Sequence, residues 1–285
     1  MTPHSPATNP KVPPAPPGVT KKVRVSHLQQ MKEAKRPIVV LTAYDAPMGQ
    51  LADAGSADVV LVGDSLGQVV HGFDTTLPVT MEMMILHTQA VVRGAKRALI
   101  VADMPFMSYQ VSPEQTLVNA GRLMKEGGAE AVKLETNNDR IMDIMRSITE
   151  AGIPVMAHIG LTPQSIHSMG GYKVQGRNSE DATKLKALAL KAQEAGAFAL
   201  VLELMPRDLA KEITASLHIP TIGIGAGSDC DGQVLVLTDL LGITEHPPRF
   251  AKKYVDMRNG TLRAVRKYSR DVRERLFPSK NHEFE

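Results

Sequence analysis

Short apolar runs that end abruptly at a polar or charged residue recur along this chain. Examples are Val59–Ser65, Leu99–Asp103, Ala131–Glu135, Pro154–His158 and Leu200–Glu203. A continuous apolar run of this length is typical of a strand buried on both faces, as in a parallel sheet. Because ligands of βα proteins bind at the carboxyl ends of such strands, the residues that end these runs are candidates for a functional site.

A second repeated pattern lies between the runs. An acid, a small residue and a glycine precede the next strand at Asp53–Gly55, Glu126–Gly128, Glu150–Gly152 and Glu194–Gly196. Glycine at this point is typical of the end of a helix, where the chain takes the left-handed conformation. The repetition indicates an αβ unit used several times, which predicts a (β/α) repeat fold.

The pattern predicts eight strands separated by helices. The strands are expected at 38–42, 59–63, 99–102, 131–134, 154–157, 199–202, 220–224 and 233–237, and helices at 28–35, 80–93, from the capping box Ser112–Gln115 onward, and 179–196. Eight parallel strands predict an α/β protein, a closed (β/α)8 TIM barrel. The short loop Ala226–Gly232 leaves little room for a seventh helix, so an open doubly wound sheet is the alternative. Such a sheet normally has a Gly-rich phosphate loop where this chain has Ala43–Ala46.

Composition narrows the class of protein. The chain has 285 residues, of which 43% are hydrophobic, enough for one barrel domain or for two small domains. The strand pattern favours one barrel domain over residues 23–285. The net charge of +3 predicts no broad nucleic-acid or membrane surface. The basic stretch Arg263–Arg275 is interrupted by acids and predicts a solvated helical face. No apolar run approaches the roughly 20 residues that span a bilayer.

Two further features bear on location and order. Cys230 is the sole cysteine, which fits a reducing compartment and predicts a cytoplasmic protein. No motif surrounds it, so we interpret it as a small loop residue. Residues 1–22 are rich in proline and predict a disordered tail.

Asp64 and Asp103 follow neighbouring predicted strands. Two carboxylates brought together repel each other, so a cation or a hydrogen-bond network is needed to ionise both. Hard oxygen ligands of this kind suit Mg²⁺. Alternatively, each aspartate caps the helix that follows it. The presence of Glu135 nearby favours the metal.

Lys133 and Glu135 are two residues apart on one strand, so their side chains point to the same face. Their apolar neighbours Val132 and Leu134 must cover the outer face, which places the charged pair inside the barrel. The alternative is a buried salt bridge.

Glu203 ends a wholly apolar strand, where partial desolvation is expected to raise its pKa and make it a general base. The alternative is an acid at a helix N-terminus.

Three weaker signals complete the set. His158 is a secondary candidate, either as a ligand, proton carrier or hydrogen-bond donor, or equally as a structural residue. Gly170–Arg177, a long connection with glycines toward both ends and a basic middle, predicts a mobile lid over an anionic ligand. Gly223–Gly227 could hold a phosphate by backbone amides, although close packing at the rim explains it equally well.

Together these residues predict metal-assisted enolate chemistry. A metal held by Asp64 and Asp103 suits a 2-oxo acid, whose carboxylate and keto oxygens would chelate it. A Lewis acid stabilises the enolate formed when a base, here Glu203, removes the adjacent proton. Lys133 would add positive charge. The residues alone give no particular substrate.

Several longer motifs resemble one enzyme family. They are Leu41–Asp45, Gly63–Gly67, Ala102–Phe106, Val132–Glu135, Ala157–Gln164 and Ile222–Gly227. In this order they are similar to ketopantoate (3-methyl-2-oxobutanoate) hydroxymethyltransferases, and the likeness runs from about residue 23 to about 275. The resemblance implies a barrel of the phosphoenolpyruvate/pyruvate superfamily, Mg²⁺ dependence and a homo-oligomer, a decamer. It also implies transfer of a one-carbon unit from 5,10-methylenetetrahydrofolate to the oxo acid, giving 2-dehydropantoate for pantothenate synthesis.

By the family pattern, Asp64 and Asp103 hold the metal, with Glu135 close by, directly or through water. Asp64, Ser65, Asp103 and Lys133 contact the oxo acid, and Glu203 is the proton acceptor. Two rival interpretations stay open. One is a lyase or mutase of the same superfamily, which usually relies on a mobile cysteine or a phosphate loop. The other is a non-catalytic barrel that senses a small acid.

Overall fold

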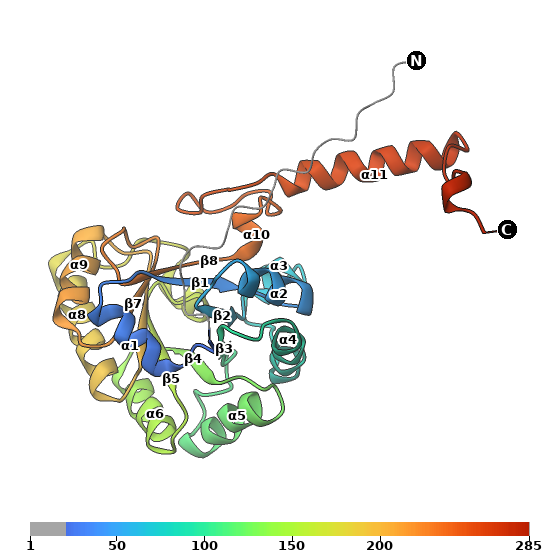
Figure 1. Cartoon of the computed structure of the whole chain (residues 1–285). Coiled ribbons are helices and arrows are strands. Elements are labelled where there is room, and N and C mark those ends of the chain that lie inside the picture. Colours follow the sequence, from blue (N-terminus) through green and yellow to red (C-terminus); the bar gives the residue numbers. More distant parts are fainter. Residues whose placement is uncertain (1–20, 285) are drawn as a thin grey trace.

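The apolar runs form eight parallel strands that close into a barrel (Figure 1). The computed structural model describes residues 21–284. The strands are β1 (Ile38–Thr42), β2 (Val59–Val62), β3 (Leu99–Asp103), β4 (Ala131–Glu135), β5 (Val155–Gly160), β6 (Ala199–Glu203), β7 (Thr221–Ile224) and β8 (Gly232–Leu235). Each strand pairs with the next in sequence, and β8 pairs with β1. The closure confirms the predicted (β/α)8 fold and excludes the open sheet.

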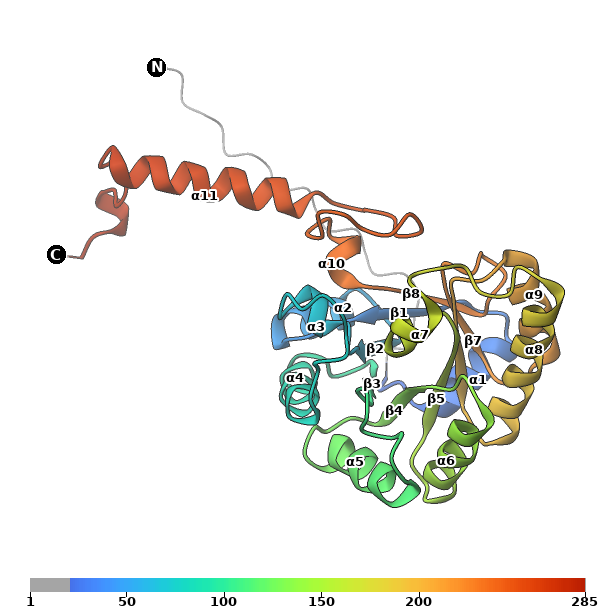
Figure 2. The same ribbon diagram turned by 180° about the vertical axis from the view of Figure 1, so that it is seen from behind.

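Helices follow most strands and surround the barrel. They are α1 (Val25–Glu33), α2 (Ala46–Ala54), α3 (Leu66–Val69), α4 (Met81–Gly94), α5 (Pro113–Lys125), α6 (Asp139–Glu150), α7 (Ile166–Met169), α8 (Ser179–Glu194), α9 (Arg207–Ser216), α10 (Leu237–Leu240) and α11 (Met257–Arg273), with 3-10 turns η1 (Pro163–Ser165) and η2 (Lys280–His282). As the sequence indicated, β7 and β8 are joined by a loop, residues 225–231. In Figure 2, α7 lies over the barrel end that faces the viewer.

Polar side chains start the helices where the sequence places them. The side chains of Asp45, Thr80, Ser112, Asn138 and Asn178 each accept a hydrogen bond from the backbone N–H three residues later. Each bond satisfies one of the unpaired donors of the first turn, which stabilises the helix by about 1 kcal/mol. The predicted start at Ser112 is therefore confirmed.

Element boundaries differ from the expectation by up to three residues. β5 continues to Gly160 because its last residues pair with β6 as far as Glu203, whereas the apolar run stopped at Ala157. α1 begins at Val25 instead of residue 28, because the Arg24 N–H donates to Nδ1 of His27. This contact is a capping box in which histidine replaces the usual glutamate or glutamine.

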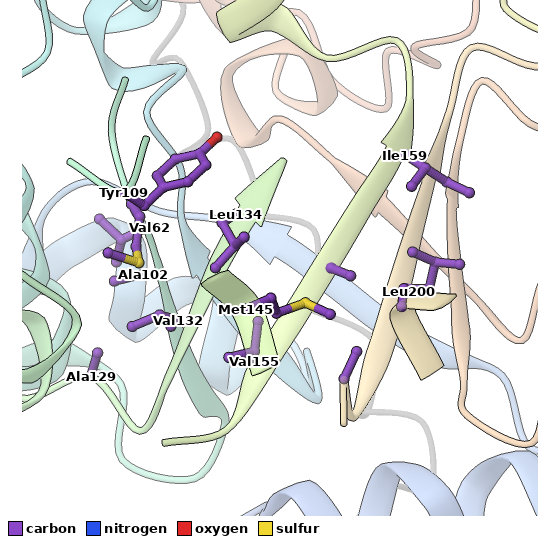
Figure 3. Close-up of a cluster of buried hydrophobic side chains, with 14 of the residues drawn as sticks. Val62, Ala102, Tyr109, Ala129, Val132, Leu134, Met145, Val155, Ile159 and Leu200 are labelled. Atoms are coloured by element: carbon purple, nitrogen blue, oxygen red, sulfur yellow. The ribbon is translucent and has the colours of Figure 1, made fainter. Parts of the chain in front are cut away.

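Alternation along the strands divides the core into two layers. Val132 and Leu134 point outward and pack against residues such as Met145 of the surrounding helices (Figure 3). The other face points into the barrel, where Val101, Ala131, Met156 and Val201 pack together. Leu28 and Met31 of α1 join this inner layer, so α1 closes one end of the barrel. The other end is left for polar residues.

The helix interpretations are confirmed at two places. Met81, Met84, Ile85 and Thr88 are buried on α4, so the methionine stripe is core. Every residue of α11 in the basic stretch is at least partly exposed, and the helix projects away from the barrel (Figures 1 and 2).

Residues 1–20, most of the predicted tail, lie outside the described residues. Lys22 lies within them, and its Nζ donates to the carbonyl of Ala98 at 2.8 Å. Between residues 21 and 284, no helix is long and apolar enough to cross a membrane.

Candidate active site at the carboxyl ends of the strands

Along the strands, the side chains that point into the barrel change from apolar to charged at the same end of the barrel. Val101 is followed two residues later by Asp103, Ala131 by Lys133 and then Glu135, Met156 by His158, and Val201 by Glu203. These residues, with Asp64 and Ser65, line one cavity of about 770 Å³. All seven predicted site residues are therefore brought together, and the inward orientation expected for Lys133 and Glu135 is confirmed.

Asp64 and Asp103 are held against each other at the ends of β2 and β3. The backbone N–H of Asp64 donates to Oδ2 of Asp103 at 3.0 Å. A Cβ on Gly63 would lie 2.9 Å from Oγ of Ser65, so glycine leaves room for the Ser65 hydroxyl beside these acids. Burial, and then the charge of Asp103, raise the pKa of Asp64 to about 7. A proton or a cation is therefore needed here near neutral pH.

Lys133 is the cation of this group. Its Nζ lies 3.0 Å from Oδ1 of Asp103. Burial would lower the pKa of Lys133, but the charges of Asp103, Asp64 and Glu135 outweigh it and raise the pKa, so the lysine stays charged. Oδ1 of Asp103 is buried and accepts no hydrogen bond of good geometry from any residue that the structure describes. Its contact with Lys133 is thus an ion pair, and the oxygen keeps lone pairs available to a ligand.

Glu135 is organised by a residue to which the sequence analysis gave no role. Both carboxylate oxygens of Glu135 accept the backbone N–H of Gln164, at 3.1 and 3.2 Å. The Gln164 side chain donates from Nε2 to Oδ2 of Asp64 at 2.8 Å, and its Oε1 accepts the Tyr109 hydroxyl at 2.7 Å. Gln164 thus links two predicted metal ligands. Burial, and then Asp64, raise the pKa of Glu135 well above its usual range.

The signal for Gln164 was present in the sequence. Gln164 closes the motif Ala157–Gln164, six residues beyond His158, in the connection that leaves the rim after β5. Its backbone lies in a 3-10 turn that starts at Pro163 and directs its N–H toward the strand ends. A glutamine among acids at such a rim has the donors needed to hold carboxylates.

Glu203 and His158 face each other on β6 and β5. Oε2 of Glu203 lies 3.2 Å from Nε2 of His158, although neither ring nitrogen makes a hydrogen bond of good geometry within residues 21–284. Burial, and then the charge of Lys133, lower the pKa of His158, so the imidazole is neutral at pH 7. Gly160 has φ +99° and a Cβ there would lie 2.2 Å from the Glu203 carbonyl oxygen; glycine is thus required beside Glu203.

Tyr44 forms the wall beside Ser65. The Tyr44 hydroxyl and Oγ of Ser65 are 2.9 Å apart, and Tyr44 is buried. Burial raises the pKa of Tyr44 beyond its normal range, and the charges of Asp103 and Asp239 add to the shift. The phenol therefore stays protonated and fixes the position of the Ser65 hydroxyl.

The carboxylates are not arranged as a finished metal centre. No three His, Cys, Asp or Glu side chains of the described chain have the geometry to hold a metal ion. Glu135, in particular, is engaged by the N–H of Gln164. Nevertheless the donor set fits a hard divalent cation, because Asp64, Asp103, Glu135 and Glu203 face a single lysine in one buried cavity.

The weaker candidates have different outcomes. Tyr172 of the predicted lid lines the cavity, and Nε2 of Gln68 donates to its hydroxyl at 3.3 Å. In the glycine loop, a Cβ on Gly225 would meet the ring of Phe250 at 2.9 Å, which favours close packing at the rim as the reason for this glycine. Burial raises the pKa of the Cys230 thiol, which fits the interpretation as a small loop residue.

An eight-stranded parallel barrel with acids, a lysine and a histidine at the carboxyl ends of its strands is the architecture of a TIM-barrel enzyme. The fold matches solved structures of low sequence identity. A 2,3-dimethylmalate lyase, described as a member of the PEP mutase/isocitrate lyase superfamily, gives a TM-score of 0.58 at 14% identity, covering 92% of this chain and 91% of that chain. A phosphonopyruvate hydrolase solved in complex with oxalate and Mg²⁺ also gives 0.58, at 12% identity, covering 91% and 93%. These likenesses agree with the expected (β/α)8 barrel fold.

Sequence relatives are far closer. The chain is 53% identical over 264 residues to the 3-methyl-2-oxobutanoate hydroxymethyltransferase of Carboxydothermus hydrogenoformans, covering 92% of this chain and 95% of that protein. It is also 53% identical to the protein of the same name from Trichodesmium erythraeum, covering 90% and 97%. The ketopantoate hydroxymethyltransferase family matches residues 22–280. The chain belongs to this family.

Proposed function

We propose that this protein transfers a hydroxymethyl unit from 5,10-methylenetetrahydrofolate to 3-methyl-2-oxobutanoate, giving 2-dehydropantoate for pantothenate synthesis. The observation that carries the proposal is the gathering of Asp64, Asp103, Lys133 and Glu203 around one cavity, in a chain of this family. These side chains supply the anionic ligands, the positive charge and the base that enolate chemistry on an oxo acid needs.

Asp64 and Asp103 would hold Mg²⁺, with Glu135 beside them or joined through water. The imbalance of four acids and one lysine supports a divalent cation here, as does Oδ1 of Asp103, which is buried and, among the described residues, is paired only with Lys133. A bound Mg²⁺ supplies Lewis-acid stabilisation of negative charge on the oxygens of the oxo acid. That a barrel of the same fold was solved with Mg²⁺ and oxalate, itself a small acid with paired oxygens, also supports the proposal.

Asp64, Ser65, Asp103 and Lys133 would contact the oxo acid. Lys133 is charged and buried, so it attracts the carboxylate and the developing oxyanion in a site from which water is largely excluded. The Ser65 hydroxyl, positioned by Tyr44, donates or accepts a hydrogen bond at the same end of the cavity.

Glu203 would remove the proton from the branched carbon next to the keto group. The proton moves to the Glu203 carboxylate, and the electron pair it leaves forms the new C–C bond to the methylene carbon of the folate. Both bonds from that carbon to the folate nitrogens break, water supplies the hydroxyl oxygen, and the two nitrogens take up protons as tetrahydrofolate leaves. His158, neutral and 3.2 Å away, limits the positions that the Glu203 carboxylate can take. We infer for His158 a positioning role, because its neutral ring faces the Glu203 carboxylate without adding a charge.

We further propose that residues 23–285 act as one catalytic domain in a cytoplasmic homo-oligomer, a decamer. Leu262, Val265, Tyr268 and Val272 recur on α11 at helical spacing and are 42–57% exposed. This apolar stripe on a projecting helix supports contact with a second copy. Native mass spectrometry of the full chain and of a variant with these four residues changed to serine tests the assembly, since the variant should dissociate.

The experiment that tests the activity is hydrogen–deuterium exchange at the branched carbon of 3-methyl-2-oxobutanoate. With Mg²⁺ the protein should exchange this proton without folate, and with 5,10-methylenetetrahydrofolate it should form 2-dehydropantoate. Removal of Mg²⁺ with a chelator should stop both. A protein that binds the oxo acid but neither exchanges the proton nor forms product would instead be a sensor barrel.

A further inference from the structure

The cavity extends well beyond the ends of the catalytic strands. Its volume of about 770 Å³ is in the range that encloses drug-sized ligands, whereas a small oxo acid at Asp103 and Lys133 fills one end. The remainder is lined by the segment that follows β8, including Asp239, Ile243, His246, Pro248, Arg249 and Phe250. A second, larger ligand therefore has room beside the oxo acid.

Asp239 is a buried acid that the proposed mechanism does not use. It lies on α10, lines the cavity and is 5% exposed. Burial raises its pKa, and a hydrogen bond with the Thr244 side chain opposes that shift. In the described part of the chain it has no cationic partner. Because a desolvated carboxylate with only one side-chain donor and no cation beside it is unfavourable, a ligand with N–H groups would bind there.

The position of Asp239 is fixed by the barrel. The backbone N–H of Leu237 donates to Oγ1 of Thr42 at 3.0 Å, which ties α10 to the end of β1. The charges of both Asp103 and Asp239 raise the pKa of Tyr44, so both carboxylates lie within electrostatic reach of its hydroxyl. Asp239 thus shares the cavity with the predicted metal site.

We propose that Asp239 binds the 2-amino-4-oxopyrimidine edge of a reduced pteridine; this rests on the proposed function, whose one-carbon donor carries that ring. The edge presents two adjacent N–H donors, on the ring nitrogen and the amino group, and a carboxylate accepts such a pair with both oxygens, as it does from arginine. Ile243, Pro248 and Phe250 provide apolar walls for the flat ring.

The exposed end of the cavity suits the glutamyl end of the same one-carbon donor, the folate. Arg249 and His246 line it and are exposed, and neither makes an ion pair with any residue between 21 and 284. A folate ends in glutamyl carboxylates, which a guanidinium binds well. Asp239 would therefore hold the ring and Arg249 the anionic tail.

Two probes separate these contacts: 6-methyltetrahydropterin, which has the ring without the tail, and tetrahydrofolate, which has both. Binding to the Mg²⁺- and oxo-acid-loaded protein is measured by calorimetry. Asp239→Ala should weaken both ligands by roughly 10- to 100-fold, the value of charge-assisted hydrogen bonds. Arg249→Ala should weaken tetrahydrofolate and leave the pterin unchanged.

The matched control is Asp58→Asn. Asp58 is another buried acid, but it accepts the Val39 N–H at 3.0 Å and lies outside the cavity lining, so pterin affinity should stay at the parent value. In steady state, Asp239→Ala should raise KM for 5,10-methylenetetrahydrofolate and leave KM for the oxo acid unchanged.

Proton exchange at the oxo acid separates failure of this inference from failure of the proposed function, because it needs neither Asp239 nor a pteridine. If Asp239→Ala exchanges normally and binds both probes as tightly as the parent, the inference is overturned and the function stands. If the parent protein does not exchange, the proposed function itself fails. If Asp239→Ala loses proton exchange because the alanine disturbs the fold, Asp239→Asn, which keeps the size of the side chain, is measured instead. Pterin affinity equal to that of the parent protein in Asp239→Asn would overturn the inference.

Discussion

The two ends of the cavity are built in different ways. The floor consists of side chains on strand ends, Asp103, Lys133, Glu135, His158 and Glu203, whose positions follow from the register of the barrel. The roof consists of residues 236–250, which follow β8 and contain only the single helical turn α10. The floor is dense in charge, and the roof combines apolar residues with one buried acid.

This difference separates two tasks. Enolate chemistry needs charges held at fixed positions, which strands in a closed sheet provide with little freedom. Recognition of a large co-substrate needs surface area, which a connection of variable length provides. Substitutions in the floor should therefore change proton exchange and metal binding, whereas substitutions in the roof should change co-substrate binding alone.

The largest effect is expected for Glu203→Gln. The amide cannot accept the substrate proton, so exchange at the branched carbon should fall by about 10²- to 10⁴-fold. Affinities for the oxo acid and for tetrahydrofolate should change little, because the predicted metal ligands Asp64 and Asp103 and the residues of the roof are unchanged. NMR of the substrate in D₂O measures the exchange, and calorimetry measures the affinities. Exchange at the parent rate would remove Glu203 from the mechanism.

Asp103→Ala should weaken the binding of Mg²⁺ and of the oxo acid at the floor, a step that precedes proton removal. It removes a predicted metal ligand and leaves the buried Lys133 charge without its nearest partner. We expect Mg²⁺ affinity to fall by more than the roughly 100-fold that loss of a supporting residue causes, together with oxo-acid affinity. Calorimetric titration with Mg²⁺ checks this, and Asp239→Asn serves as the roof control with parent affinity. Undiminished Mg²⁺ binding would contradict the assignment.

The floor could be predicted from the sequence because strand position fixes it. Two-residue alternation placed Lys133 and Glu135 inside, and the abrupt ends of the apolar runs located Asp103 and Glu203. The prediction that these residues act as metal ligands, substrate contacts and base came partly from the family resemblance, and it stays a prediction.

What the sequence analysis missed lies on connections. Gln164 reaches Asp64 across 100 positions of sequence through a turn, and no periodic pattern encodes such a contact. Asp239 follows the last predicted strand, so the same strand-end rule would have selected it.

Gln164→Leu should have a smaller effect than loss of a ligand. Leucine keeps the bulk and the backbone N–H to Glu135, but removes the bond to Asp64 and leaves the Tyr109 hydroxyl without its acceptor. Mg²⁺ affinity should fall by roughly 10- to 100-fold. Gln89→Leu on α4, whose amide bonds the Glu126 carbonyl, is the control and should not change it. Equal Mg²⁺ affinity in the two variants would show that Gln164 does not support the site.

The smallest effect, and the one that best distinguishes floor from roof, is the pH dependence of Mg²⁺ binding. The folded pKa of Asp64 is about 7, whereas the unfolded value is about 3.9. Between these values the metal-free folded protein retains a proton that the unfolded chain has lost, so its free energy of unfolding should decrease as pH rises through this window.

Mg²⁺ needs the ionised Asp64 carboxylate, so Mg²⁺ binding releases that proton. Mg²⁺ affinity should therefore rise by up to about tenfold per pH unit toward pH 7 and then level off. Calorimetry in buffers of different ionisation enthalpy counts the released protons. Asp239→Asn should leave this profile unchanged, because that acid lies in the roof; a flat profile in the parent protein would mean that Asp64 is already ionised without the metal.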